Sequence, residues 1–509
     1  MSGDIGISSY HTARGTLYLI IKALVVGASN AFFFIFIARF LPTLSDIGLF
    51  QGLYSLITIS VTLGGAGLSR AAVRFISVNL GAGRAKTAQA IYSSIYRLGL
   101  ISAAALSVTL YLLSYYIASV FFHNTDYTYL IRLASIDSFF LTMIIFSTSL
   151  LYSMQEFKKA VVISILNSLL KLSAAFLFVL FQMGIDGIMV GFIVGDVISM
   201  AIFFYVLLPR IRKKSASLGD LRPLFNYSLP LYGYSVIVYL STEIDIYLLL
   251  LLSNLSIVGI YSPAVFLGTM LFLGQTALDQ SLGPLFSRLY GKSGIKSLEE
   301  ISIPASRYIF LLYLPIGFST LASAPTILTT ILGERFSESI YPTTIIIIAI
   351  IVTSLTPLFN NILMSAGYSR VFLKSSTLAL SAQLVISFVT IPSAGGLGAS
   401  IARAASYLVL FLFPAYELGR ITGHLRFDKK ALVRALLGSA IVALIIWVLN
   451  TYFSSPFYLP FNLFVGFLGY LLFLRFTKTI NIRDIEIINE VLRGKARPLM
   501  NIITKVVIQ

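Results

Sequence analysis

Long apolar runs, separated by short polar segments, follow one another along almost the whole chain. A helix needs about 20 apolar residues to cross the roughly 30 Å hydrocarbon core of a bilayer. The pattern predicts fourteen spans and therefore an all-α polytopic membrane protein. They cover residues 16–38, 47–68, 98–121, 131–153, 161–182, 187–208, 226–250, 257–283, 304–326, 342–366, 375–392, 397–418, 432–451 and 460–476.

The basic residues orient these spans. With the N-terminus inside, thirty of the 37 Lys and Arg residues fall in inner segments. The outer segments carry only Arg39, Arg132 and Arg335. Since inner loops are enriched in Lys and Arg, the sequence predicts a multi-pass protein of the cell membrane with both termini cytoplasmic. Residues 69–97, with interleaved Arg and apolar positions, are predicted to form a basic amphipathic helix on the inner leaflet.

Similar turns recur at a nearly constant spacing. The segment 44–50 resembles 255–261, the Gly184 and Gly187 pair recurs as Gly395 and Gly398, and the turn 153–158 precedes 365–370 by 212 residues. Gly-rich turns recur in many polytopic proteins, but here the matched turns hold equivalent places in the topology. We predict two parallel six-helix repeats around a central cavity. The predicted domains are a first repeat 1–208, a basic cytoplasmic linker 209–225, a second repeat 226–418, helices 13 and 14 within 419–476, and a basic cytoplasmic tail 477–509.

Composition excludes several classes of protein. The chain is 57% apolar and 11% charged, whereas soluble domains are about a quarter charged. Its net charge of +17 is explained by topology, so no nucleic-acid partner is expected. The chain has no cysteine and three scattered histidines, so we expect neither a metal centre nor catalytic residues. The longest outer loop, 327–341, is too short for a catalytic domain, and the protein is predicted not to be an enzyme.

Charged residues inside predicted spans are costly and usually face a wet interior or a partner. Lys171 and Asp196 lie near the middle of adjacent spans and could pair, either as a structural ion pair or in a substrate path. Glu243 and Asp245 lie two residues apart, on different sides of one helix. One of them is expected to face the cavity, with a cation- or proton-binding role open for either. Asn167 is expected to hydrogen-bond between helices.

Two further cations complete the candidates. Lys22 lies about two turns from the inner end of its span, where it could reach the headgroups or line a cavity. Arg403 lies about two turns from the outer end of its span and is a candidate anion-binding residue. For Lys22, contact with the inner headgroups is as favoured an interpretation as cavity lining.

Several stretches together resemble a known family. They are Tyr227–Pro230, Glu243–Asp245, Val258–Ser262, Gly283–Arg288 and Ala366–Arg370. Their order, with fourteen spans and two parallel repeats, resembles the polysaccharide flippase branch of the multidrug/oligosaccharidyl-lipid/polysaccharide exporter superfamily. The resemblance covers about residues 10–475.

This resemblance implies a function. A member would flip a polyprenyl- or dolichyl-phosphate-linked oligosaccharide from the cytoplasmic to the outer leaflet, by alternating access and with cation coupling, for cell-surface polysaccharide or glycoprotein glycan assembly. Lys22, Lys171 and Arg403 would contact phosphate or sugar. Asp245, which matches a cation ligand of some relatives, and also Glu243 and Asp196, would serve coupling.

The resemblance also bears on partners and alternatives. No cofactor is expected beyond a coupling Na⁺ or H⁺. The expected partners are membrane lipids and glycan-assembly enzymes, and the protein is expected to be a monomer. The alternative is a multidrug or organic-cation antiporter of the same superfamily, against which the absence of an acid inside the first two spans counts.

Overall fold

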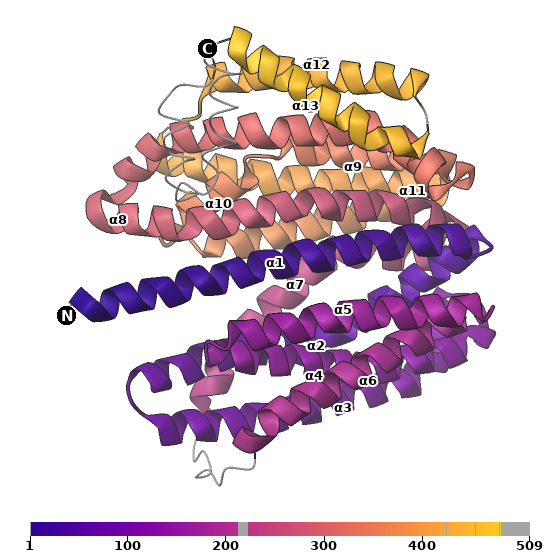
Figure 1. The fold of residues 1–509 in the computed structure, drawn as a ribbon, viewed down its shortest axis with the longest axis vertical. Coiled ribbons are helices and arrows are strands. Elements are labelled where there is room, and N and C mark those ends of the chain that lie inside the picture. Colours follow the sequence, from indigo (N-terminus) through magenta and orange to yellow (C-terminus); the bar gives the residue numbers. More distant parts are fainter. Residues whose placement is uncertain (1, 212–221, 424, 454, 478, 480–509) are drawn as a thin grey trace. The chain divides into compact units, whose positions relative to one another are not determined.

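The computed structural model describes residues 2–211, 222–423, 425–453, 455–477 and 479, and every regular element within these ranges is helical (Figure 1). Thirteen helical stretches of the described residues are long and apolar enough to cross a membrane. The chain is therefore a multi-pass, all-α membrane protein, as predicted. It divides into two compact units, Met1–Gly259 and Ile260–Gln509.

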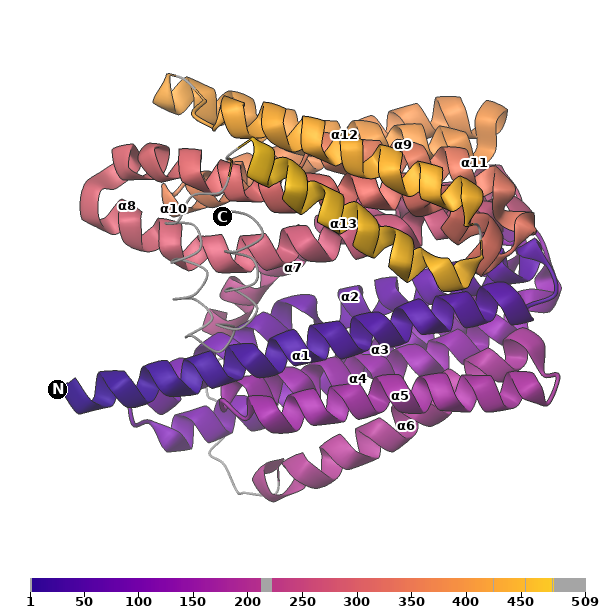
Figure 2. The same cartoon turned by 45° about the horizontal axis from the view of Figure 1, so that its top comes forward.

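The first unit is built from seven long helices and the first turn of an eighth. They are α1 (Ser2–Phe40), α2 (Leu44–Gly81), α3 (Ala85–Phe121), α4 (Thr128–Ser153, preceded by the short η1, Thr125–Tyr127), α5 (Phe157–Leu180), α6 (Gly184–Ile211), α7 (Arg222–Leu252) and the start of α8 (Leu255–Thr326). Helix α2 packs against α3, α4 and α7, and α5 packs against α1 and α6. Figure 2 shows α3 to α6 side by side.

Helix α2 begins at a capping box. The Thr43 hydroxyl accepts from the Asp46 backbone N–H at 3.1 Å, and the Asp46 carboxylate accepts from the Thr43 N–H at 3.0 Å. Each residue thus satisfies one of the N–H groups that a helix start leaves open.

The basic segment 69–97 does not form a separate surface helix, so that prediction is wrong. Helix α2 runs on to Gly81 and α3 begins at Ala85, with only a tight turn between them. The reason is burial: Ala72 and Ile76 on α2 and Ala88 on α3 are at most 2% exposed. Their apolar face packs into the bundle, while Arg74 remains exposed on the other face.

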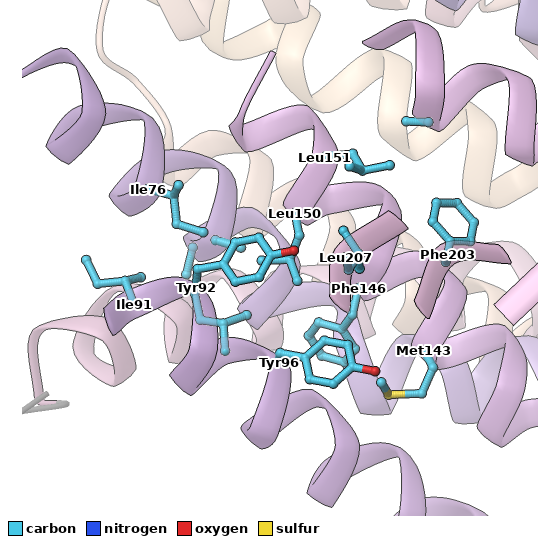
Figure 3. Close-up of a cluster of buried hydrophobic side chains, with 14 of the residues drawn as sticks. Ile76, Ile91, Tyr92, Tyr96, Met143, Phe146, Leu150, Leu151, Phe203 and Leu207 are labelled. Carbon is cyan, nitrogen blue, oxygen red and sulfur yellow. The ribbon is translucent and has the colours of Figure 1, made fainter. Parts of the chain in front are cut away.

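The core of the first unit joins α2, α3, α4 and α6 toward one end of the bundle. Figure 3 shows Tyr92, Phe146 and Leu207 gathered between these helices. Phe146 and Leu207 are completely buried and Tyr92 is 1% exposed. Burying side chains of this size stabilises the unit by about 1.5–3 kcal/mol each. The same packing fixes the rotation of α4 and α6, which carry Asp137 and Asp196.

The second unit continues α8 and adds the remaining helices. They are η2 (Ile327–Leu332), η3 (Glu334–Ser339), α9 (Ile340–Val352), α10 (Thr356–Ser365), α11 (Arg370–Thr422), α12 (Lys429–Tyr452), η4 (Pro456–Tyr458) and α13 (Leu459–Phe476). Two of these helices reverse within their length, at Gly294 (φ 67°) and Gly395 (φ 51°). Only glycine adopts such backbone angles at little cost. The arms of α8 lie together, since the Tyr313 hydroxyl donates to the Leu271 carbonyl at 3.0 Å.

The predicted span 342–366 is broken into two helices, so a single helix there is wrong. Helix α9 ends at Val352 and α10 begins at Thr356. Pro357 has no N–H to donate to the Thr353 carbonyl, and its ring crowds that carbonyl. The Thr353 carbonyl instead accepts from the Thr356 backbone N–H at 3.0 Å. The count of fourteen spans stays a prediction, because α11 counts as one stretch yet contains both 375–392 and 397–418.

Left-handed residues recur along the chain at the spacing seen in the sequence. The corresponding positive-φ positions are Gly83 and Gly294, Gln155 and Gly367, and Gly184 and Gly395, which lie 211 or 212 residues apart. This is the pattern that a duplicated six-helix unit would give, although the predicted domain boundaries stay predictions. Of the linker 209–225 and the tail 477–509, residues 212–221, 478 and 480–509 lie outside the described residues.

Candidate functional site

A polar cavity of about 430 Å³ lies within the first unit, between α1, α2, α4, α5 and α6. Its hydroxyl and amide lining comes from several helices and includes Ser29, Asn30, Thr148, Ser164, Asn167 and Ser168. Two of the predicted cations, Lys22 on α1 and Lys171 on α5, line this same cavity. The fold therefore brings together two candidates that lie 149 positions apart in the sequence.

Lys22 stands against an aromatic residue of α4. Its ammonium donates to the Tyr152 hydroxyl at 3.4 Å and lies 5.8 Å from the centre of the Tyr152 ring. Both residues border the cavity. Among the described residues, the Lys22 ammonium thus has only a long contact to a neutral partner, and it can turn toward an anion in the cavity.

Lys171 is the centre of a buried charge cluster. Its Nζ lies 2.8 Å from Asp196 Oδ2 on α6 and 3.8 Å from Asp137 Oδ2 on α4. Both carboxylates are completely buried, whereas the Lys171 side chain is 14% exposed. The predicted pairing of Lys171 with Asp196 is therefore confirmed. The second carboxylate gives the cluster one more negative charge than positive when all three groups are ionised.

The two carboxylates differ in their hydrogen bonds. Asn167 on α5 donates to Asp196 Oδ1 at 2.7 Å and to the Ser199 hydroxyl at 3.0 Å, which is the interhelical role predicted for it. Neither oxygen of Asp137 accepts a hydrogen bond. A buried carboxylate without donors is costly, so Asp137 depends almost wholly on Lys171.

Close packing of α5 on α6 creates this cluster. Gly187, Gly191 and Gly195 recur every fourth residue on α6, and such small residues let membrane helices approach closely. A Cβ on Gly191 would lie 2.5 Å from the Ala175 backbone nitrogen, and one on Gly195 would lie 2.8 Å from that of Lys171. Asp196 follows directly and so meets the Lys171 side chain.

The two lysines occupy different levels of the cavity. Lys171 Nζ lies 4.7 Å from the Phe192 ring centre, and that ring lies 5.2 Å from the ring of Phe33 on α1. Phe33 is eleven residues beyond Lys22 on the same helix, which corresponds to roughly 16 Å at 1.5 Å per residue. The cavity thus offers two separated cations: Lys22 on α1 itself, and Lys171 on α5 near the level of Phe33.

The other predicted acids lie on α7 and do not line this cavity. Glu243 accepts a hydrogen bond from the Ser55 hydroxyl of α2 at 3.4 Å. Asp245 is completely buried, and its Oδ1 accepts from the backbone N–H of Ile246 at 3.0 Å. Their roles in cation coupling stay predictions.

Arg403 belongs to the second unit, on α11. It is 4% exposed, and its guanidinium donates to the Tyr407 hydroxyl at 3.4 Å. The Tyr407 ring packs edge-on against Phe272 of α8 at 4.9 Å. An anion-binding role for Arg403 stays a prediction.

Asp137 is the one member of the cluster that our sequence reasoning missed. It lies in Ser135-Ile136-Asp137-Ser138, inside the predicted span 131–153. The rule that selected Asp196, an acid within an apolar span, would have selected it as well. Among the described residues no group of three or more His, Cys, Asp or Glu side chains could hold a metal ion.

The chain is similar to known transporters in sequence and fold. It is 22% identical over 259 residues to a protein of Haloferax volcanii described as the probable low-salt glycan biosynthesis flippase Agl15, covering 50% of this chain and 55% of that protein. The match thus spans only about half of the relative's length. The fold resembles the lipid II flippase MurJ in an inward closed conformation, with a TM-score of 0.70, 13% identity, and coverage of 91% of this chain and 98% of MurJ.

A second solved structure is similar too. It is a multidrug resistance MATE family transporter of the MOP superfamily in an inward-facing conformation, with a TM-score of 0.63, 16% identity, and coverage of 79% of this chain and 96% of that one. These similar proteins are flippases and transporters, which agrees with the prediction that the chain is not an enzyme. A sequence model of the polysaccharide biosynthesis protein family matches residues 36–341. Since that match covers more than half of the 509 residues, the chain belongs to the polysaccharide biosynthesis protein family, as the resemblance predicted.

Proposed function

We propose that this protein flips a glycan linked to a polyprenyl or dolichyl phosphate from the cytoplasmic to the outer leaflet of the cell membrane. The observation that carries the proposal is the placement of Lys22 and Lys171 on the wall of one polar cavity. The flipping proceeds by alternating access and is coupled to a cation, and both termini are cytoplasmic. The family membership and the similarity to flippases support the same function.

The chemistry of such a substrate suits the cavity. A phosphate or diphosphate diester is anionic at every physiological pH, so it needs cationic partners once it leaves water. Lys22 and Lys171 offer ammonium groups at two levels, and the hydroxyl and amide lining offers hydrogen bonds to sugar hydroxyls. The isoprenoid chain is apolar and stays in the bilayer, so only the headgroup has to cross.

A second candidate function is export of an organic cation. The surplus carboxylate of the Asp137, Lys171 and Asp196 cluster and the aromatic wall formed by Phe33, Tyr54 and Phe192 favour it. The MATE-like fold is compatible with it. The two lysines of the same cavity count against it, because each would repel a cationic substrate.

Reconstitution in liposomes tests the proposal. A fluorescent polyprenyl-diphosphate N-acetylglucosamine is placed in both leaflets, and the fraction quenched by an external reductant is followed with time. We expect the wild type to make the inner-leaflet probe accessible and Lys22→Ala to slow this at least tenfold. Lys158→Ala, which removes an exposed lysine at the start of α5, is the control and should keep the wild-type rate.

Two outcomes would contradict the proposal. If the wild type moves no probe, the flippase function is wrong. If an organic cation such as ethidium is transported and the probe is not, the antiporter is the better description.

A further inference from the structure

Lys171 carries one positive charge, and a phosphate bound to it would compete with two carboxylates for that charge. Within the part of the chain that the structure describes, its ammonium is the only cation that lies within 4.0 Å of Asp137 or Asp196. If Lys171 turns to a phosphate, two buried carboxylates that reach the same nitrogen are left without their positive partner. Like charges so close together favour protonation of one of them.

We propose that Asp137 carries a proton whenever Lys171 is engaged by the substrate phosphate. This inference rests on the proposed function, since it names what happens in the same cavity when the headgroup binds. The step is a simple protonation: water in the cavity supplies one proton to the Asp137 carboxylate, and the Lys171 ammonium exchanges a carboxylate for a phosphate oxygen. The proton leaves when the phosphate leaves and Lys171 returns.

The contacts select Asp137 over Asp196 as the protonated group. Asp196 keeps the Asn167 hydrogen bond at 2.7 Å when Lys171 departs, so its charged form retains a donor. Asp137 has no such donor and lies a full ångström further from the ammonium than Asp196 does. Its charged form therefore loses its whole compensation, and protonation removes the cost.

Burial orders the two events. Asp137 is completely buried, whereas 14% of the Lys171 side chain that contacts it is exposed. Asp137 does not line the cavity itself, whereas Lys171 does. Movement of Lys171 toward a phosphate therefore uncovers the carboxylate at the moment when it needs a proton.

Few other ionisable groups of the described residues lie near Asp137. Tyr54 of α2 lies within electrostatic reach of the cluster and of Glu243 on α7. Lys171 comes from α5 and Asp196 from α6. From α3, the Ser107 hydroxyl donates to the Ser135 carbonyl near Asp137 at 2.6 Å, and the stretch 99–110 of that helix contains no titratable residue.

Linkage makes the proposal measurable as a pH dependence of binding. If the phosphate prefers the protonated cluster, protonation and phosphate binding reinforce each other equally. Affinity is then highest at the acidic end. The affinity then falls by up to tenfold per pH unit. This steepest fall occurs in the pH range where the free cluster is deprotonated and the probe-bound cluster still holds its proton. A diphosphate diester does not titrate between about pH 5 and 10, so the probe adds no slope of its own.

The test uses the full chain in detergent with the fluorescent polyprenyl-diphosphate N-acetylglucosamine. Its dissociation constant is measured from pH 6 to 9.5 in choline chloride. We expect the wild type to lose affinity with rising pH and Asp137→Asn to bind equally at every pH, with the affinity of the wild type at its acidic end. Asp186→Asn removes an exposed acid from the first turn of α6 and should keep the wild-type slope.

A second measurement needs no variant of Asp137. Adding saturating probe to the wild type in weak buffer at alkaline pH should take up close to one proton per bound molecule, read with a pH dye. Lys171→Met, which cannot exchange partners, should take up none.

The outcomes separate this inference from the proposed function. Binding without a pH slope, a slope that persists in Asp137→Asn, or an affinity that follows Na⁺ instead of pH would each overturn the role of Asp137 while leaving a flippase intact. A slope that persists in Asp137→Asn would point to Lys22. If the probe does not bind at any pH, the proposed function fails and the inference fails with it.

Discussion

The hydroxyls of Ser45 and Ser256 lie 2.7 Å apart and share a hydrogen bond. Ser45 is the second residue of α2 and Ser256 the second residue of α8, so the two side chains hold equivalent positions 211 residues apart. Such a contact is what a two-fold relation between the predicted repeats would give. The first turns of α2 and α8 meet through residues that hold the same position in each helix.

Backbone contacts just behind these serines lead to the first prediction. A Cβ on Gly48 would lie 1.9 Å from the Leu255 carbonyl oxygen, and one on Gly259 would lie 2.0 Å from that of Leu44. Because neither backbone can yield without moving its helix, Gly48→Ala should push the two helix starts apart at a cost of about 1–3 kcal/mol. The loss should appear as a lower temperature of unfolding in detergent.

Gly65→Ala is the matched control for this change. It lies on the same helix, and its Cβ would meet the nearest atom at 3.7 Å, an ordinary contact. We expect it to unfold at the wild-type temperature or slightly above. An equal loss from both variants would show that helix α2 tolerates no added methyl group and that the contact with α8 has no special part in it.

The second prediction is a reversible lock. The chain has no cysteine, so Ser45→Cys with Ser256→Cys introduces one pair whose side chains already meet, as a disulfide requires. Mild oxidation should join them in high yield. If alternating access separates these helix starts, oxidation should stop flipping of the fluorescent probe, followed with a non-reducing external quencher, and a reductant should restore it. Each single cysteine variant should flip at the same rate under both conditions.

Parts of this arrangement could be read from the sequence because charged residues and repeated turns stand out against an apolar background. The pairing of Lys171 with Asp196 and the correspondence of 44–50 with 255–261 are of this kind. The full lining of the cavity in the first unit could not be predicted in this way, since five helices build it and their rotation is set by packing. Asp137 illustrates what the sequence does not provide. Its place within a predicted span is evident from the sequence, but it becomes a partner of Lys171 only because α4 packs beside α6.

The third prediction concerns Asn167, which supports the charge cluster. Asn167→Leu removes the donor to Asp196 Oδ1 and leaves that buried oxygen unsatisfied, which costs about 1–3 kcal/mol. Thermal unfolding in detergent should show this loss. In an Asp196→Leu background the same change should cost much less, because no acceptor is left behind. Equal costs in both backgrounds would mean that the hydrogen bond does not support the cluster.

The fourth prediction is a pH dependence outside the membrane spans. Glu156 lies in the turn between α4 and α5, where it pairs with Arg210 of α6 and, at 3.0 Å, with Lys159. Partial burial raises the pKa of this carboxyl. The hydrogen bonds and charges of Arg210 and Lys159 lower the pKa by more than burial raises it, so the net shift is downward. A carboxyl with a lowered pKa stabilises the fold above its unfolded pKa, and this stability is lost as the pH falls through the folded pKa.

Glu156→Gln should therefore lower the unfolding temperature at pH 7, and this loss should shrink as the pH falls through the lowered folded pKa of Glu156, below which both proteins carry a neutral side chain. The pair is partly exposed, with 23% of the Glu156 side chain accessible, so solvent screening limits the loss to about 1 kcal/mol or less. Glu300→Gln, which changes an exposed acid, is the control. Its unfolding temperature should stay close to that of the wild type at both pH values. If Glu156→Gln loses as much at pH 3.5 as at pH 7, the ion pair with Arg210 is not the cause, and the amide must disturb the turn by its shape.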